Sequence, residues 1–163
     1  MQELAGLLHS ATAYEKRGLR AFDAGDWPSA VAAFRKAVEL APESATLHHR
    51  FGTALSLSGN TRGAVEQFEE AIRRAPGYAP AHFSLGVLLV AAGRHADAVE
   101  RFSTALRYEP SNADARLQLA VALLRLQKYQ DAHAQLVEGA RLHPDRAEFA
   151  RLLQQMRVVP KTQ

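Results

Sequence analysis

The sequence predicts an all-α protein built from repeated pairs of helices. The first observation is a skeleton of alanine, phenylalanine, alanine and proline, present as Ala30, Phe34, Ala37 and Pro42. It returns three times at one constant interval, and a fixed period of this length indicates a repeat architecture. The second observation is that the 163 residues are 47% hydrophobic and 23% charged, which suits a folded domain rather than a disordered chain. The later copies of the skeleton are Ala64, Phe68, Ala71, Pro76, then Ala98, Phe102, Ala105, Pro110, and a weaker set, Ala132, Leu136, Gly139, Pro144.

The N-terminal residues 1–10 are predicted to form a short helical extension. Leu4, Leu7 and Leu8 recur there at helical spacing, so this segment would cap the open end of the array. The first unit then occupies residues 11–44, and its first helix is free of proline up to Ala24.

The first unit predicts the turn that separates its two helices. Gly25 breaks the first helix, and Asp26 is a natural N-cap for the second. Pro28 falls within the first helical turn, where its missing N–H costs nothing, and Trp27 is placed to pack over the turn. Pro42 then ends the second helix, because proline disfavours helical geometry in the residue before it.

The remaining chain repeats this plan with one variation. The further units span residues 45–78, 79–112 and 113–146. In the last of them Ala120 replaces glycine and Gln127 replaces the turn glycine, so we expect this unit to pack more loosely. Residues 147–158 predict a C-terminal capping helix, which a repeat array needs to cover its last apolar face, and residues 159–163 form a tail. We assign the packed face of the capping helix to Ala147, Ala150, Leu153 and Met156.

Composition and charge exclude several functional classes. The chain has no cysteine, so it has no disulfide framework or thiolate metal site. Its net charge is +3, with basic and acidic residues interleaved rather than gathered in a stripe, which does not favour nucleic-acid binding. Its longest apolar stretch is too short to span a bilayer, and residues 1–10 do not resemble a secretory signal. We therefore expect a cytoplasmic protein, and its alanine-rich, arginine-rich composition suggests a bacterial source.

No catalytic, metal or cofactor site is expected. The chain lacks a Walker A loop, a GxGxxG turn, a GxSxG elbow and an HExxH motif. His48 and His82 stand at the same position of adjacent units, which would hold them too far apart to share a metal ion. We interpret them as solvated or half-packed side chains.

Together these residues resemble the tetratricopeptide repeat (TPR) family. The resemblance covers residues 11–146 as four helix-turn-helix TPR units, of which three are nearly complete and in strict phase. It implies a right-handed superhelical α-solenoid whose first helices line a concave groove for peptides or partner helices. The clamp of basic and amide residues found in family members that bind chaperone tails is missing, as is the asparagine ladder of the sugar-transferase members.

The groove implied by this resemblance would be partly apolar. We expect it to bind a protein or peptide, such as an acidic-hydrophobic segment, through an apolar floor with mostly basic polar contacts. The alternative is that some of these apolar residues bind no partner and are buried by the curvature of the array or by its ends. The candidate groove residues are Lys16, Leu19, Phe22, His49, Arg50, Phe83, Val87, Val90, Leu117, Gln118, Val121, Leu124 and Arg125.

The sequence leaves three functions open. The first is a non-catalytic scaffold that binds a peptide or amphipathic helix in the groove. The second is a self-assembly module, in which an end face or the N-terminal helix of one copy docks on another copy. The third is a recognition or regulatory domain of a larger enzyme or of a secretion or assembly complex.

Overall fold

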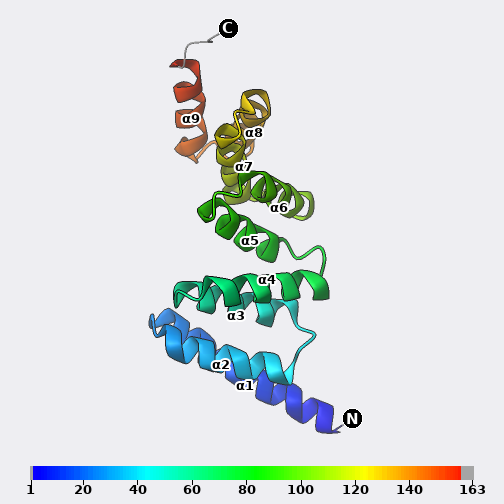
Figure 1. The fold of residues 1–163 in the computed structure, drawn as a ribbon. Coiled ribbons are helices and arrows are strands. Elements are labelled where there is room, and N and C mark those ends of the chain that lie inside the picture. The colour runs from blue at the N-terminus through cyan, green and yellow to red at the C-terminus, as the bar shows by residue number, and fades with distance from the viewer. Residues whose placement is uncertain (1, 159–163) are drawn as a thin grey trace. The chain divides into compact units, whose positions relative to one another are not determined.

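The computed structural model describes residues 2–158 of the backbone and the side chains of residues 10–156. Met1 and the predicted tail, residues 159–163, lie outside this range, as do the side chains of Leu4, Leu7 and Leu8. Within the described backbone there are nine helices and no strand (Figure 1). The helices are α1 (Gln2–Asp23), α2 (Trp27–Leu40), α3 (Ala45–Leu57), α4 (Thr61–Arg74), α5 (Ala79–Ala91), α6 (His95–Tyr108), α7 (Ala113–Arg125), α8 (Tyr129–Leu142) and α9 (Ala147–Val158).

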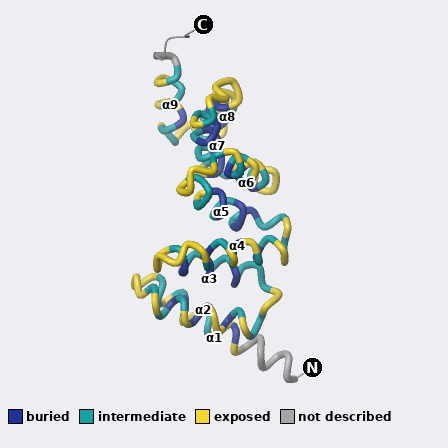
Figure 2. The backbone as a smooth tube through the Cα atoms, in the orientation of Figure 1, coloured by how far each residue is buried: buried dark blue, intermediate teal, exposed yellow. Residues whose placement is uncertain are grey.

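The chain divides into two compact halves. The division falls between Ser84 and Leu85, inside α5. The first half holds α1 to α4 and the start of α5, and the second half holds the rest of α5 with α6 to α9. Figure 2 shows buried and exposed stretches alternating along the helices, which is the pattern of helices that pack through one face.

The N-terminal extension is not a separate helix. It is continuous with the first helix of the first unit, because α1 runs without a break from Gln2 to Asp23. The other first helices, α3, α5 and α7, each begin within the unit to which they belong. The first helix of the array is therefore extended in the N-terminal direction.

Each turn within a unit contains one left-handed residue, and a short polar side chain caps the second helix in the first two units. Asp26 accepts a hydrogen bond from the backbone N–H of Ser29 at 3.1 Å, and Asn60 accepts one from Gly63 at 2.9 Å, so each caps a second helix. The turn glycines have φ values of +71°, +86° and +74°, where glycine is favoured. In the fourth unit Gln127 takes this position with φ of +58°, a conformation that disfavours a side chain.

A glycine on one helix and a phenylalanine on the next form the core of each of the first three units. A Cβ atom on Gly18 would lie 2.7 Å from the ring of Phe34, and one on Gly52 would lie 2.7 Å from the ring of Phe68. In the second half, a Cβ atom on Gly86 would lie 2.6 Å from Phe102. The absent methyl groups let the two helices approach closely enough to enclose each ring.

The fourth unit achieves the same burial with different residues. Ala120 and Leu136 stand at the repeat positions of Gly86 and Phe102, and both are fully buried together with Phe149 of α9. A larger residue on α7 and a smaller one on α8 thus compensate for each other. This burial does not indicate the looser packing expected from the sequence.

The capping helix packs through a face that only partly matches the predicted one. Leu153 and Met156 pack against the buried cluster of the fourth unit, whereas Ala147 and Ala150 are exposed. Phe149 is fully buried, and its ring lies over Gly139, where an added Cβ atom would overlap it. The prediction was wrong for the two alanines because it missed the one residue large enough to fill the space beside Gly139.

Buried polar side chains hold the turns between units. His48 Nε2 lies 2.9 Å from the carbonyl oxygen of Pro42, and His82 Nε2 lies 2.8 Å from that of Pro76. In the second half an Arg116 N–H donates to the carbonyl oxygen of Pro110 at 2.6 Å. All three side chains are at most 8% exposed, so the interpretation of His48 and His82 as solvated or half-packed was wrong. Each provides a hydrogen-bond partner for a carbonyl group of the turn between units.

Candidate partner-binding surface

The first helices of the second half have one packed face and one open face. The buried residues of α7 are Ala115, Arg116, Leu119, Ala120, Ala122 and Leu123. The five candidate residues of α7 lie on the opposite side of the helix, because their spacing of three and four residues keeps them on one face. They are Leu117, Gln118, Val121, Leu124 and Arg125.

The same division holds along α5. Leu85 and Gly86 are buried, whereas Phe83 and Val90 are partly exposed and Val87 is 39% exposed. Phe83, Val87 and Val90 follow one another at intervals of four and three residues, which places them on one side of α5. α5 is therefore apolar on its open face as well as on its packed face, and a helix of this kind is normally covered on both.

Leu117 is the candidate that the chain's own end covers in part. It packs against the buried cluster of Ala120, Leu136 and Phe149, to which α9 also contributes Met156. Leu117 is therefore partly buried by the end of the array, which is the alternative considered from the sequence. The other apolar candidates of α7 do not belong to this cluster.

The open face of α1 carries one cation and two apolar residues. Lys16 is exposed on α1, and Leu19 is partly exposed one turn further on. Phe22 is partly exposed, and its ring packs edge-on against Trp27, with 5.2 Å between the ring centroids. Trp27 thus packs over the turn as predicted, and its ring contacts part of the Phe22 ring.

Two of the predicted basic contacts are not free cations. Arg50 of α3 forms an ion pair with Glu15 of α1. His49 Nε2 lies 3.0 Å from the hydroxyl oxygen of Ser84, and the His49 ring packs against the rings of Phe68 and Tyr78. The charge of Arg50 is thus compensated within the first half.

The surroundings of His49 keep its ring uncharged at neutral pH. Burial lowers the pKa of His49 from 6.5 to about 4, and the positive charge of the adjacent Arg50 acts in the same direction. His49 therefore contributes a neutral ring and a hydrogen bond to the open face of α3. Sequence spacing could not reveal this, because the pKa depends on which side chains from other parts of the chain bury the ring.

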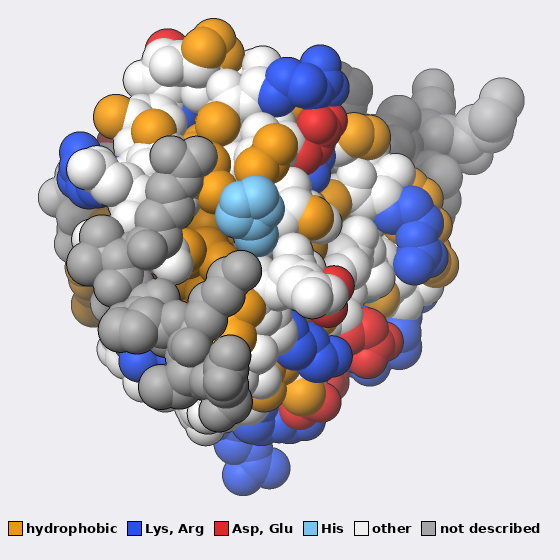
Figure 3. Space-filling view, turned by 90° about the horizontal axis from the view of Figure 1, so that it is seen from above, with side chains coloured by type: hydrophobic (Ala, Val, Ile, Leu, Met, Phe, Trp, Pro, Cys, Tyr) orange, Lys and Arg blue, Asp and Glu red, His pale blue; other side chains and the backbone are white. Residues whose placement is uncertain are grey.

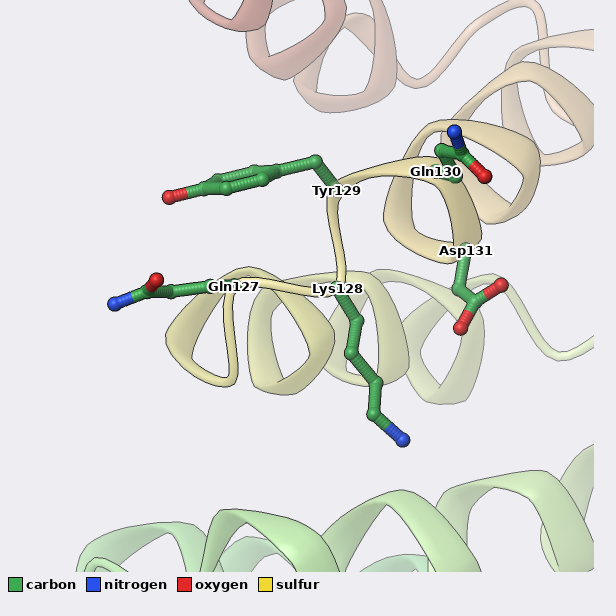
Figure 4. A pocket seen from close by; sticks show the side chains of 5 residues that line it. All are labelled: Gln127, Lys128, Tyr129, Gln130 and Asp131. Atoms are coloured by element: carbon green, nitrogen blue, oxygen red, sulfur yellow. The ribbon is translucent and has the colours of Figure 1, made fainter. Parts of the chain in front are cut away.

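An open depression of about 490 Å³ lies at the turn between α7 and α8. It is lined by five consecutive exposed residues, Gln127, Lys128, Tyr129, Gln130 and Asp131. Figure 4 shows Gln127 and Tyr129 extending to the same side of the turn, with Lys128 and Asp131 pointing to another side. Because its lining comes from one short segment, the depression is the outer surface of a turn rather than an enclosed pocket.

The chemistry of the described surface is mixed. On the face drawn in Figure 3, hydrophobic side chains are interspersed with charges of both signs. Among the described side chains, no three His, Asp or Glu groups are placed to hold a metal ion. No helix in the described part of the chain combines the length and apolarity needed to cross a membrane.

Comparison with protein-family models accounts for nearly all of the repeat region. Three models, each described as a tetratricopeptide repeat, match residues 11–44, 49–100 and 89–156. The chain belongs to the tetratricopeptide repeat family. The family resemblance found in the sequence is thereby confirmed, and so is the all-α arrangement of four TPR units followed by a C-terminal helix.

Solved structures share this TPR fold at low sequence identity. MamA from Desulfovibrio magneticus RS-1 superposes with a TM-score of 0.82 at 18% identity, covering 91% of this chain and 84% of that one. PilF from Pseudomonas aeruginosa gives a TM-score of 0.81 at 23% identity, covering 93% and 71% of the two chains. YrrB, described as a TPR protein with an unusual peptide-binding site, gives 0.75 at 22% identity, covering 89% and 75%. No curated protein sequence matches the chain significantly.

Proposed function

We propose that this TPR protein is a non-catalytic interaction scaffold that binds a peptide or a helix of a partner protein through the open faces of its first helices. The observation that carries the proposal is the apolar open face of α5, where Val87 is 39% exposed on a helix that is apolar all round. Exposed apolar surface of this kind marks interaction sites in soluble proteins.

Two further observations support the proposal. The open face of α7 continues the pattern with Val121 and Leu124, which are partly exposed and lie opposite the packed face of their helix. One solved protein of the same fold, YrrB, is described as having a peptide-binding site. A peptide that covers these valines and leucines would remove apolar surface from water, at about 25 cal/mol for each Å². Ordering and association costs offset part of this gain, and we expect affinities near the micromolar range.

The proposal is tested by capturing partners on the immobilised chain and comparing two valine substitutions. Val87→Glu places a charge on the open face of α5, whereas Val137→Glu places the same charge on α8, where the valine is 46% exposed. The two substitutions are matched in chemistry and in exposure. We expect Val87→Glu to abolish capture of a partner that Val137→Glu still retains, with unchanged helicity by circular dichroism in both variants.

Two results would reject the proposal. One is equal capture by the wild-type chain and the Val87→Glu variant. The other is an equal loss in both variants, because the interaction would then not depend on the first helices.

A further inference from the structure

One first helix, α3, differs from the others at two repeat positions of the open face. Thr53 stands where α1, α5 and α7 have Leu19, Val87 and Val121. Ser56 stands where they have Phe22, Val90 and Leu124. The open face is therefore hydroxyl-bearing on α3, apolar on α1 and aliphatic on α5 and α7. We call Val87, Val90, Val121 and Leu124 the aliphatic face.

The charges near the open faces also differ between the halves. In the first half Glu15 neutralises Arg50, so Lys16 is the candidate cation that remains without an ion pair among the described side chains. Basic and acidic residues are equal in number in residues 1–84 and again in residues 85–150, so the basic excess of the chain lies in residues 151–163. Near the open faces the halves therefore differ in how their cations are paired, not in their charge balance.

Arg125 is the cation of the second half that borders the aliphatic face. It lies in the last turn of α7, one residue after Leu124 and four residues after Val121, and it is exposed. The described ion pairs of this half engage Arg94, Arg141 and Arg146, and none of them engages Arg125. An exposed guanidinium beside an aliphatic surface is suited to a carboxylate group, which it can bind with two N–H groups.

We infer that the aliphatic face binds an aliphatic partner segment that carries a carboxylate, and that Arg125 pairs with this carboxylate. The inference rests on the proposed function and names the partner chemistry of the same surface. Within the first half, the Glu15–Arg50 contact joins α1 to α3, and the His49–Ser84 contact joins α3 to the start of α5. The same repeat spacing would place Val87 next to Val121 in the second half. Arg125 then sets the direction of the segment, with its acidic end at the C-terminus of α7.

Three short synthetic peptides test this inference on the full chain. They share one pattern of leucines and differ at a single terminal position, which is glutamate, glutamine or lysine. Affinities and binding positions are measured by titration of the ¹⁵N-labelled chain in NMR spectra. We expect shifts in α5 and α7, with the glutamate peptide binding about two- to fivefold more tightly than the glutamine peptide, as an exposed ion pair allows. The lysine peptide should bind most weakly.

Two arginine variants complete the test. Arg125→Gln should remove the difference between the glutamate and glutamine peptides, whereas Arg107→Gln, at an exposed arginine on α6, should leave it unchanged. Equal affinities for all three peptides, shifts confined to α1 and α3, or no binding at millimolar peptide would each overturn the inference. None of these results affects the comparison of Val87→Glu with Val137→Glu on a captured partner, so the proposed function is judged separately.

Discussion

Gly86→Ala is expected to destabilise the chain, although the same substitution stabilises most helices. Alanine has the higher helix propensity, by about 1 kcal/mol. However, the added methyl group would lie 2.6 Å from Cε1 of Phe102 and 2.9 Å from its Cδ1 and Cζ atoms. Phe102 is fully buried, and overpacking of a buried ring costs about 1–3 kcal/mol. We therefore expect a net loss of up to about 2 kcal/mol, the overpacking cost less the gain in propensity.

The fourth unit indicates how the loss can be reversed. It carries Ala120 and Leu136 at the positions of Gly86 and Phe102, and both are fully buried. Phe102→Leu should therefore make room for the new methyl group. The loss of stability in the double variant should be smaller than the sum of the losses in the two single variants, with a coupling free energy of about 1–2 kcal/mol.

Urea unfolding of the four proteins, followed by circular dichroism, measures this coupling. Ser103→Ala, at an exposed site on α6, is the control for helix propensity alone. If Gly86→Ala is as stable as the Ser103→Ala control, Gly86 is not packed closely against Phe102. The same conclusion follows if the effects of the Gly86 and Phe102 substitutions add without coupling.

Three further variants test other parts of the structure. Phe68→Ala empties the core of the second unit and should cost about 3–5 kcal/mol in a thermal or urea melt; no loss of stability would show that the ring is not packed as described. Gln127→Gly should stabilise by about 1 kcal/mol because φ is +58° there, with Gly93→Gln as the reciprocal destabilising control; a neutral Gln127→Gly would contradict the strain. His49 has a pKa near 6.5 when unfolded and about 4 when folded, so its contribution is present above pH 6.5 and is lost as the pH falls toward 4. The difference in stability between wild type and His49→Gln should accordingly shrink by roughly 3 kcal/mol over that pH range in urea melts at fixed pH, and a constant difference would contradict the lowered pKa.

The repeat spacing was sufficient to predict the scaffold because its packing is local and periodic. Phe34, Phe68 and Phe102 each pack against the glycine at one fixed earlier position of the same unit, and this relation is visible in the sequence as a repeated pair. The turn glycine Gly25 and the N-cap Asp26 could be predicted for the same reason. Each depends on residues that are neighbours along the chain.

The burial of Phe149 in the capping helix and of the two histidines could be predicted only from repeat positions that were not compared. α9 begins at the same point of the repeat as α7, so Phe149 stands at the position of Ala115 in the fourth unit and of Leu47 in the second, and both of these are buried. Extending the repeat beyond the fourth unit would have identified Phe149 as a core residue. Likewise, His48 and His82 each follow a proline at the same short spacing, which indicates a contact with the turn.

The candidate surface was predictable in outline but not in its electrostatics. Helical spacing was sufficient to place Val121, Leu124 and Arg125 on one face of α7. It could not show that Arg50 is paired with Glu15 or that His49 is uncharged. Those properties depend on contacts between successive units, and the sequence does not specify which charged side chains meet there.

Hydrogen–deuterium exchange of the full chain, with and without a captured partner, shows which helices the partner covers. If partners bind the open faces of the first helices, we expect increased protection in one or more of α1, α3, α5 and α7, with little change in α2, α4, α6 and α8. Protection confined to the second helices would contradict binding at the open faces of the first helices.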